Sequence, residues 1–259
     1  SGTKARKILF TADLDNDGIY GEASDTWGNI SVLSTGTSLL NFCIIERGRR
    51  TDPGAASYGG GLNIASSSIS VTNTTIRNCR ALNGGGIAVA GSSSPVISAC
   101  TLTDNVANQQ GGGIYIAAGS SPAISNVILN RNSSISPTLQ GGAIASLNSS
   151  PVIVNSTIAY SNARVAEGKS IYLENSPGAR IINTIIWGGG PVHIALSGTP
   201  ASVFSYCAVE GAALAGCINL NSNNTAPDGP NFINPELGFL NIDFNSPCRD
   251  TGADIYPGV

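Results

Sequence analysis

The chain has 259 residues, of which 11% are charged, and its formal net charge is −3 with the single histidine neutral. This charge gives no electrostatic basis for binding nucleic acid, and no apolar run approaches the roughly 18 residues that a membrane-spanning helix needs. The polar surface is instead supplied by Ser, Thr, Asn and 32 glycines, a composition common in secreted and surface-attached proteins. We therefore expect an extracellular or cell-surface location and no transmembrane segment.

Residues 1–26 are predicted to form a first strand, ILFT from Ile8, followed by an acidic loop. Three acidic residues at alternate positions, followed by a glycine, match the opening of a loop that binds calcium through oxygen ligands. The twelfth position of the loop is a serine, so another carboxylate nearby would have to complete the set. The predicted Ca²⁺ ligands are Asp13, Asp15, Asp17, Glu22 and Asp25. The alternative is a solvated acidic turn without a metal.

Residues 27–211 contain one unit repeated seven times. Its clearest copies read GGGIAVAGSSSPVISACTLTDN from Gly84 and GGGIYIAAGSSPAISNVILNRN from Gly111. An apolar residue after the glycines anchors each copy: Ile30, Leu62, Ile87, Ile114, Ile144, Ile171 and Ile194. Intervals of 23 to 32 residues indicate a solenoid, because one unit alone cannot bury its own apolar face.

Each copy has a second apolar anchor, 14 or 15 residues after the first. These second anchors are Ile45, Ile76, Leu102, Leu129, Ile158, Ile186 and Val209. The distance from a second anchor to the next copy varies from 8 to 17 residues, so all length variation falls on one side of the coil. In repeat proteins such insertions form loops on one face, which is often the binding face.

The segments are short, β-branched, alternately apolar and bounded by Gly, Ser, Asn and Pro, which is typical of strands with one buried face. The sequence therefore predicts an all-β fold, a right-handed parallel β-helix of about seven coils. Stacking aligns a column of small inward side chains: Cys43, Thr74, Cys100, Val127, Ser156, Thr184 and Cys207. In four coils the preceding residue is an asparagine, Asn73, Asn126, Asn155 or Asn183. Because Asn tolerates the left-handed conformation, we expect an asparagine ladder at a tight turn.

Two rows of side chains are candidate ligand-binding sites, because adjacent coils lie about 4.8 Å apart. The second position after the second anchor gives Arg47, Asn78, Asp104, Arg131 and Tyr160, a polar row that could hold a sugar chain or an acidic partner. The outward positions of the strand after the glycines are Ser31, Asn63, Ala88, Tyr115, Ala145, Tyr172 and Ala195. Tyr115 and Tyr172 are then two coils apart and could form a stacking platform. Both rows could equally be ordinary surface residues.

Residues 212–259 lose the repeat, are rich in Asn and Pro, and are predicted to fold back over the last coil as an irregular C-terminal cap. Cys217 and Cys248 lie in this segment, and a disulfide between them or two free thiols are equally compatible with the sequence. At the other end, nothing covers the first strand, and an uncovered strand edge is normally capped or used for stacking. Either the chain is trimmed there, or this end pairs with another copy to give an end-to-end homo-oligomer.

The repeat resembles known surface proteins. A GGGI or GGAI start followed by an apolar-x-x-Asn pattern, as from Leu102 to Asn105 and from Leu129 to Asn132, is similar to the repeats of polymorphic outer-membrane proteins and of other right-handed parallel β-helix surface proteins. The opening ARKILFTADLDNDG…WGNI and the late SPCRDTG resemble segments that flank such helices. The resemblance spans nearly the whole chain and implies the β-helix fold. It implies little about function, because the fold hosts lyases, hydrolases, adhesins and structural proteins.

No convincing catalytic constellation is visible in the sequence. Glycoside hydrolysis needs two carboxyl groups within roughly 5 to 9.5 Å, whereas the loop side offers only the scattered Glu46, Asp104, Glu167 and Glu210. His193 has no acidic neighbour in sequence and is expected to be exposed. We therefore expect a structural or adhesive surface protein that contacts carbohydrate or another cell-surface ligand. The alternative is a polysaccharide-binding or lyase-like protein that uses Arg77 or Arg131 with Asp104.

Overall fold

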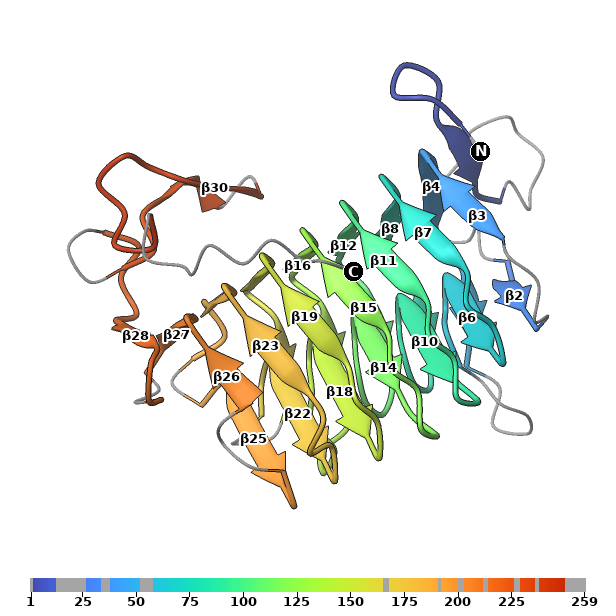
Figure 1. The fold of residues 1–259 in the computed structure, drawn as a ribbon. Coiled ribbons are helices and arrows are strands. Elements are labelled where there is room, and N and C mark those ends of the chain that lie inside the picture. The colour runs from blue at the N-terminus through green and yellow to red at the C-terminus, as the bar shows by residue number, and fades with distance from the viewer. Residues whose placement is uncertain are drawn as a thin grey trace.

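The structure is a computed structural model that describes residues 2–12, 27–33, 38–51, 58–164, 168–190, 192–199, 203–211, 214–225, 229–235 and 238–249. The chain winds through seven coils, and each coil contributes one strand to each of three parallel sheets (Figure 1). The predicted solenoid of about seven coils is confirmed. The strands stack in register, so that Ile87 lies between Leu62 and Ile114 of the neighbouring coils.

Sheet 1 follows the glycines of each repeat. Its seven strands are β2 (Ile30–Val32), β6 (Leu62–Ala65), β10 (Ile87–Ala90), β14 (Ile114–Ile116), β18 (Ile144–Leu147), β22 (Ile171–Glu174) and β25 (Ile194–Ser197). Sheet 2 contains β3 (Leu39–Asn41), β7 (Ser70–Thr72), β11 (Val96–Ser98), β15 (Ala123–Ser125), β19 (Val152–Val154), β23 (Arg180–Ile182) and β26 (Phe204–Ser205). All pairs within these sheets are parallel, as expected for strands contributed by successive coils.

Sheet 3 carries the second anchors and extends beyond the seven coils at both ends. Its nine strands are β1 (Ile8–Phe10), β4 (Cys43–Glu46), β8 (Thr75–Arg77), β12 (Thr101–Thr103), β16 (Ile128–Asn130), β20 (Thr157–Ala159), β24 (Ile185–Trp187), β27 (Ala208–Glu210) and β28 (Ile218–Leu220). Sheet 4 has five two-residue strands, β5 (Arg49–Arg50), β9 (Arg80–Ala81), β13 (Val106–Ala107), β17 (Ser133–Ser134) and β21 (Asn162–Ala163). The variable loops lie between sheet 4 and sheet 1.

The core is a set of apolar stacks that run along the helix axis. Inward residues of sheets 1, 2 and 3, such as Leu102, Ile114 and Ile124, are at most 1% exposed and form one continuous cluster. The predicted inward column is also confirmed, since its seven residues from Cys43 to Cys207 are all at most 4% exposed. Each coil buries its apolar face only against its neighbours, which is the stacking requirement that the repeat predicts.

Non-glycine residues take positive φ at three sharp turns of the coil, which lie between sheets 1 and 2, between sheets 2 and 3, and between sheets 3 and 4. Between sheets 2 and 3 the first turn row contains Phe42, Asn73, Ala99, Asn126, Asn155, Asn183 and Tyr206, with φ from 48° to 53°. The left-handed conformation predicted for its asparagines is confirmed. The predicted amide ladder is interrupted, because Ala99 lies between Asn73 and Asn126 in the row. Further along the row the amides do bond, since Asn183 Nδ2 donates to Asn155 Oδ1 at 3.2 Å.

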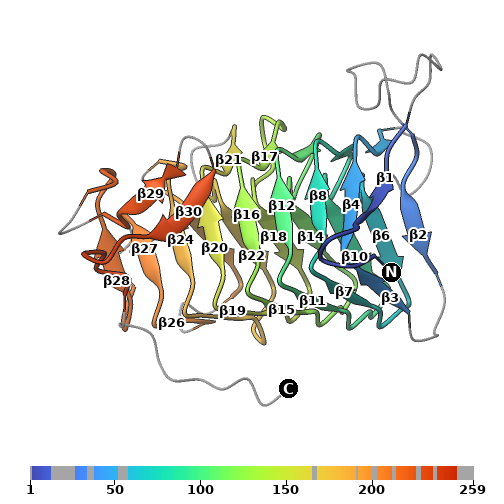
Figure 2. The ribbon, with the colours of Figure 1, turned by 90° about the horizontal axis from the view of Figure 1, so that it is seen from above.

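The C-terminal segment covers the side of the solenoid. Strand β28 pairs with β27 and so lies on the last coil. The antiparallel hairpin of β29 (Phe232–Asn234) and β30 (Phe239–Ile242) then lies across the outer face of sheet 3 (Figure 2). A second apolar cluster forms there, in which Phe232 and Leu240 pack with Trp187 and Ala159. The hairpin therefore buries outward residues of several coils in addition to the last one.

Candidate functional site

The predicted polar row lies at the sharp turn between sheets 3 and 4. Its members are Arg47, Asn78, Asp104, Arg131 and Tyr160, and all have φ between 51° and 58°. We call this set the second turn row. Backbone hydrogen bonds join each of these turns to the next coil: Asp104 N donates to Asn130 O and Arg131 N donates to Ala159 O, both at 3.1 Å. The structure thus brings these residues together as the spacing predicts.

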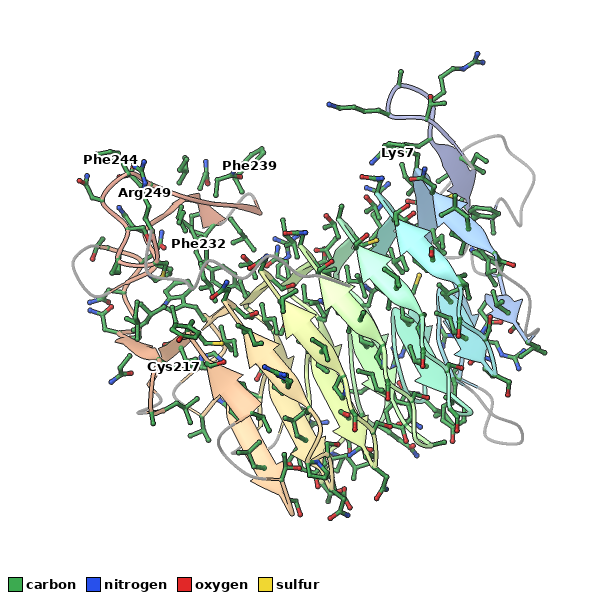
Figure 3. The ribbon with its side chains drawn as sticks, in the orientation of Figure 1. Lys7, Cys217, Phe232, Phe239, Phe244 and Arg249 are labelled. Atoms are coloured by element: carbon green, nitrogen blue, oxygen red, sulfur yellow. The ribbon has the colours of Figure 1, made fainter. Side chains whose placement is uncertain are left out.

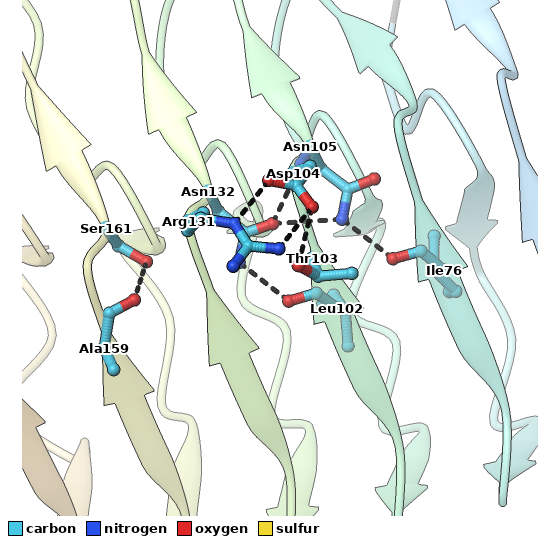
Figure 4. Close-up of polar contacts among 9 residues, drawn as sticks. All are labelled: Ile76, Leu102, Thr103, Asp104, Asn105, Arg131, Asn132, Ala159 and Ser161. Carbon is cyan, nitrogen blue, oxygen red and sulfur yellow. Dashed lines mark hydrogen bonds and ion pairs between the residues drawn. The ribbon is translucent and has the colours of Figure 1, made fainter. Parts of the chain in front are cut away.

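Asp104 and Arg131 form a two-pronged ion pair within the second turn row (Figure 4). Arg131 Nε lies 2.8 Å from Oδ1 and Nη2 lies 3.0 Å from Oδ2, while the Thr103 hydroxyl donates to Oδ2 at 2.9 Å. Partial burial alone would raise the pKa of Asp104, but the hydrogen bonds from Arg131 and Thr103 and the arginine charge outweigh it and lower this pKa. The hydrogen bond to Asp104 likewise raises the pKa of Arg131. Neither group is therefore set up to accept a proton.

Arg77 has a different carboxylate partner from the one the lyase hypothesis required. It lies on β8 opposite Glu46 of β4, and its Nε and Nη2 approach Glu46 Oε2 at 2.7 and 2.6 Å. Glu46 is buried, so the arginine neutralises a carboxylate that has little access to water. Of the two arginines considered, the structure pairs only Arg131 with Asp104. Tyr160 of the same row contacts Trp187 edge-on, with ring centroids 5.3 Å apart.

The two predicted platform tyrosines lie on the outer face of sheet 1. Tyr115 and Tyr172 both pair with Ala145, one from each side, which confirms their two-coil separation of about 9.6 Å. Tyr58, from the loop before Gly59, adds a third ring stacked on Tyr115, with centroids 5.7 Å apart and planes within 12°. Ala88 and Ala145, which pair with Tyr115 from either side, are completely buried. We call Tyr58, Tyr115 and Tyr172 the tyrosine face.

A carboxylate borders the tyrosine face. The Tyr172 hydroxyl donates to Glu174 Oε2 at 2.9 Å. Burial and the neighbouring Glu174 charge raise the pKa of both Tyr115 and Tyr172, the former also through Tyr58, so the rings remain neutral phenols at physiological pH. Neutral, half-buried aromatic rings are suited to stacking, and phenol hydroxyl groups both donate and accept hydrogen bonds.

A buried polar corner bears on the third glycine of each triple-glycine run. Asn105 and Asn132 are completely buried behind the second turn row and bond from coil to coil (Figure 4). Asn105 Nδ2 donates to Ile76 O and to Asn132 Oδ1, both at 3.0 Å, and Asn105 Oδ1 accepts from Cys79 N at 3.0 Å. A Cβ on Gly86 would lie 2.7 Å from Gly113 O and 3.2 Å from Asn105 Nδ2, so a glycine at this position leaves space for the neighbouring backbone and for the amide. The apolar-x-x-Asn pattern was the sequence signal for this ladder.

His193 contradicts its prediction, because it is 1% exposed. It precedes Ile194 just as Gly86 precedes Ile87, and so it lies in the same inward column. The ring reaches two partners that are distant in sequence: Nδ1 is 2.8 Å from Ser170 Oγ, and Nε2 is 2.8 Å from Glu210 Oε2. Burial lowers the pKa of His193 although Glu210 opposes this shift. The sequence-based expectation failed because coil stacking, and not chain proximity, supplies the acid.

The three residues follow the order of a nucleophile, a base and an acid. In the neutral histidine, Nε2–H donates to Glu210 and Nδ1 accepts from the Ser170 hydroxyl, so the two ring nitrogens have the opposite roles from those in the serine-protease relay. Glu210 Oε2 also accepts from Gly188 N at 2.7 Å. However, Ser170 is completely buried, so its hydroxyl cannot meet a substrate atom. The network fills the polar corner in the last coils, where Asn105 and Asn132 fill it in two of the earlier ones.

The family described as right handed beta helix region matches residues 16–166 and, in a second overlapping match, residues 107–246. These two matches cover most of the chain. The chain is a right-handed β-helix protein. Among curated proteins and among solved structures, no match to it was found.

Membership of this family confirms the resemblance as far as the β-helix fold. The narrower likeness to polymorphic outer-membrane proteins stays a prediction. No helix in the described part of the β-helix is long and apolar enough to cross a membrane. The proposed calcium ligands of the β-helix, Asp13, Asp15, Asp17, Glu22 and Asp25, all lie outside the described residues, and among the described residues no cluster of three metal-binding side chains occurs.

All six cysteines of the β-helix are free thiols in the structure. Cys217 packs against the main core, whereas Cys248 packs against the second apolar cluster, so the two are not joined. Cys79, which had no predicted role, lies in the polar corner beside Asn105. Burial raises the pKa of Cys79 to about 12, so this thiol is inert at neutral pH.

Proposed function

We propose that this right-handed β-helix is a structural and adhesive protein of a cell surface or extracellular medium, and that it contacts polysaccharide through the tyrosine face. The low charge and the Ser, Thr, Asn and Gly surface support such a location. The repeated coils give a rigid scaffold on which side chains recur at fixed intervals. An adhesive role needs such a scaffold and an exposed recognition surface, and does not need a catalytic centre.

The observation that carries this proposal is the arrangement of the three tyrosines. Tyr58 and Tyr115 form one stacked pair, and Tyr172 stands two coils further along the axis with a buried alanine between them. Flat rings on a rigid sheet lose little conformational entropy on binding and present both an apolar face and a hydroxyl group. Their spacing of about 9.6 Å along the axis is close to the length of a disaccharide, which suits a linear chain of sugars.

The test is a binding screen against soluble neutral and acidic polysaccharides, with the variants Tyr115→Ala and Tyr172→Ala. We expect at least one polysaccharide to bind the original chain and each variant to bind it at least tenfold more weakly. Tyr115→Phe keeps the ring and should retain most of the affinity. Binding that survives both alanine substitutions would overturn the role of the tyrosine face. Depolymerisation of the polysaccharide that is lost in Asp104→Ala would instead favour the lyase-like alternative.

End-to-end stacking is a second candidate for the structural role. Strands β1, β2 and β3 end three sheets, and large apolar side chains near them are exposed: Ile8, Leu9, Leu33 and Leu39. Such edges are templates for pairing with a second copy. Particle size measured by light scattering and negative-stain microscopy, with calcium and with chelator, tests this idea. Filaments are expected if stacking occurs, and calcium-dependent filaments would support the acidic loop as a metal site. A monodisperse monomer at high concentration with the native N-terminus would refute it.

A further inference from the structure

A cavity lies between the first turn row and the C-terminal segment, on the side of the molecule away from the tyrosine face. Its volume is about 300 Å³. Asn155 and Asn183 of the first turn row line one wall, together with Tyr206, and Cys248 of the C-terminal segment lines another. The first residues of β20 and β24, Thr157 and Ile185, pair in register beneath it. Three coils and the segment that crosses them therefore build one concave site.

The lining of this cavity is polar but carries no acidic or basic side chain. Asn183 Nδ2 donates to Asn155 Oδ1, which fixes the Asn155 amide so that its NH₂ group remains to donate. Within the described part of the chain, the Thr157 and Tyr206 hydroxyl groups form no hydrogen bond and are available to a ligand. Donors and acceptors without charge recognise hydroxyl groups, whereas a phosphate or carboxylate ligand would need a cation.

Tyr206 supplies the apolar part of the recognition. It occupies a position that is asparagine in four other coils, and its side chain is 54% exposed in spite of its size. An exposed aromatic ring beside convergent amide and hydroxyl groups provides stacking and hydrogen bonding from the same wall. Figure 3 shows the C-terminal segment standing above the last coils, with Phe232 and Arg249 on it. Cys248 of this segment borders the cavity on the side opposite the coils.

We propose that this cavity binds one uncharged pyranose ring of a saccharide, stacked on Tyr206 and hydrogen-bonded by Asn155 and Thr157. The site is separate from the tyrosine face, which lies on sheet 1, so its existence does not depend on the function proposed above. It would give the β-helix a second sugar contact. Cys248 supplies a reporter in the same wall, because a bound ring would shield its thiol.

The experiment titrates the chain with glucose, galactose, mannose and N-acetylglucosamine, with their β-linked tetramers, and with galacturonic acid as a charged comparison. Binding is followed by calorimetry and by alkylation of Cys248, mapped by mass spectrometry. We expect a neutral sugar to bind saturably and to slow the alkylation of Cys248. Tyr206→Asn should weaken this binding at least tenfold, since it removes the ring but restores the residue that tolerates positive φ in the other coils.

Two matched variants complete the test. Thr157→Val keeps the shape of the side chain and removes its hydroxyl, and should weaken binding several-fold. Asn126→Gly changes the same turn row outside the cavity and should leave the binding unchanged. Alkylation of Cys248 reports on the cavity and not on the tyrosine face, so the two sites can fail separately. The proposal is overturned if no neutral sugar binds, if galacturonic acid binds more tightly than the neutral sugars, or if Tyr206→Asn binds as tightly as the original chain.

Discussion

Gly189 lies directly against the imidazole of His193, and a Cβ on this glycine would stand 3.1 Å from His193 Cε1. In earlier coils the relationship is reversed, because a glycine in the His193 column faces a large asparagine, as Gly113 faces Asn132. The coils that contain Asn105 and Asn132 thus place one large polar side chain in this corner and keep the opposite position a glycine. A large side chain on one side of the corner is thus matched by a glycine on the other, and we call this relationship size compensation.

The asparagine ladder is expected to be a major source of stability. Replacing Asn105 by Ala would leave the amide of Cys79 and the carbonyl of Ile76 buried without their partner. We expect the free energy of unfolding to fall by about 3 kcal/mol, which urea denaturation would measure. Asn126 is exposed in the first turn row, and Asn126→Gly should change stability by less than about 1 kcal/mol. Equal effects for the two substitutions would contradict this interpretation of the ladder.

The size compensation predicts that a second substitution, which shrinks the facing side chain, restores part of the stability lost when a corner glycine is enlarged. Gly113→Ala would bring a methyl group within 2.8 Å of Leu129 Cδ2 and 3.3 Å of Asn132 Cγ, so we expect a loss of about 2 kcal/mol. The next coil has Ala143 in the glycine column and Ser161 in place of the asparagine. Adding Asn132→Ser to Gly113→Ala should therefore lose less stability than the sum of the two single changes. Strict additivity in this double-mutant cycle would refute the coupling.

Stability should depend on pH through His193, the only histidine of the chain. Burial lowers its pKa in the folded state below the ordinary value of 6.5, so the unfolded chain takes up the proton first as the pH falls. The contribution to stability is thus complete above about pH 6.5 and declines as the pH falls below this value toward the folded-state pKa. His193→Gln should remove this decline between about pH 7 and pH 5. An unchanged slope in that variant would assign the effect to other groups.

The two ion pairs should differ in strength because their carboxylates differ in burial. Glu46 is 6% exposed, so Arg77→Met would leave a buried negative charge and is expected to cost about 2 kcal/mol of unfolding free energy. Asp104 and Arg131 are both more than one-third exposed, and Arg131→Met should cost only about 0.5 kcal/mol. Thermal unfolding of the two variants under the same conditions would measure this difference. A larger loss for Arg131→Met would contradict the ranking.

Much of the fold could be predicted from the repeat alone. The coil count, both sets of anchors, the inward column from Cys43 to Cys207 and the alignment of the second turn row all appear in the structure as expected. These features repeat in every coil, and parallel pairing in register forces equivalent positions to stack. The separation of Tyr115 and Tyr172 followed from the same rule, although the Tyr58 ring that stacks on Tyr115 came from a variable loop.

Tertiary structure alone decided which polar side chains meet. Arg77 has Glu46 on one side and Thr103 on the other, and only the packed coils determine that it pairs with the glutamate. The burial of His193 depended on Gly189 in the preceding coil and on Glu210 later in its own. The amino-acid sequence determined the backbone stack, because every coil repeats the same apolar spacing. The polar contacts were set coil by coil, because each depends on the volume and hydrogen-bonding groups that its immediate neighbours leave available.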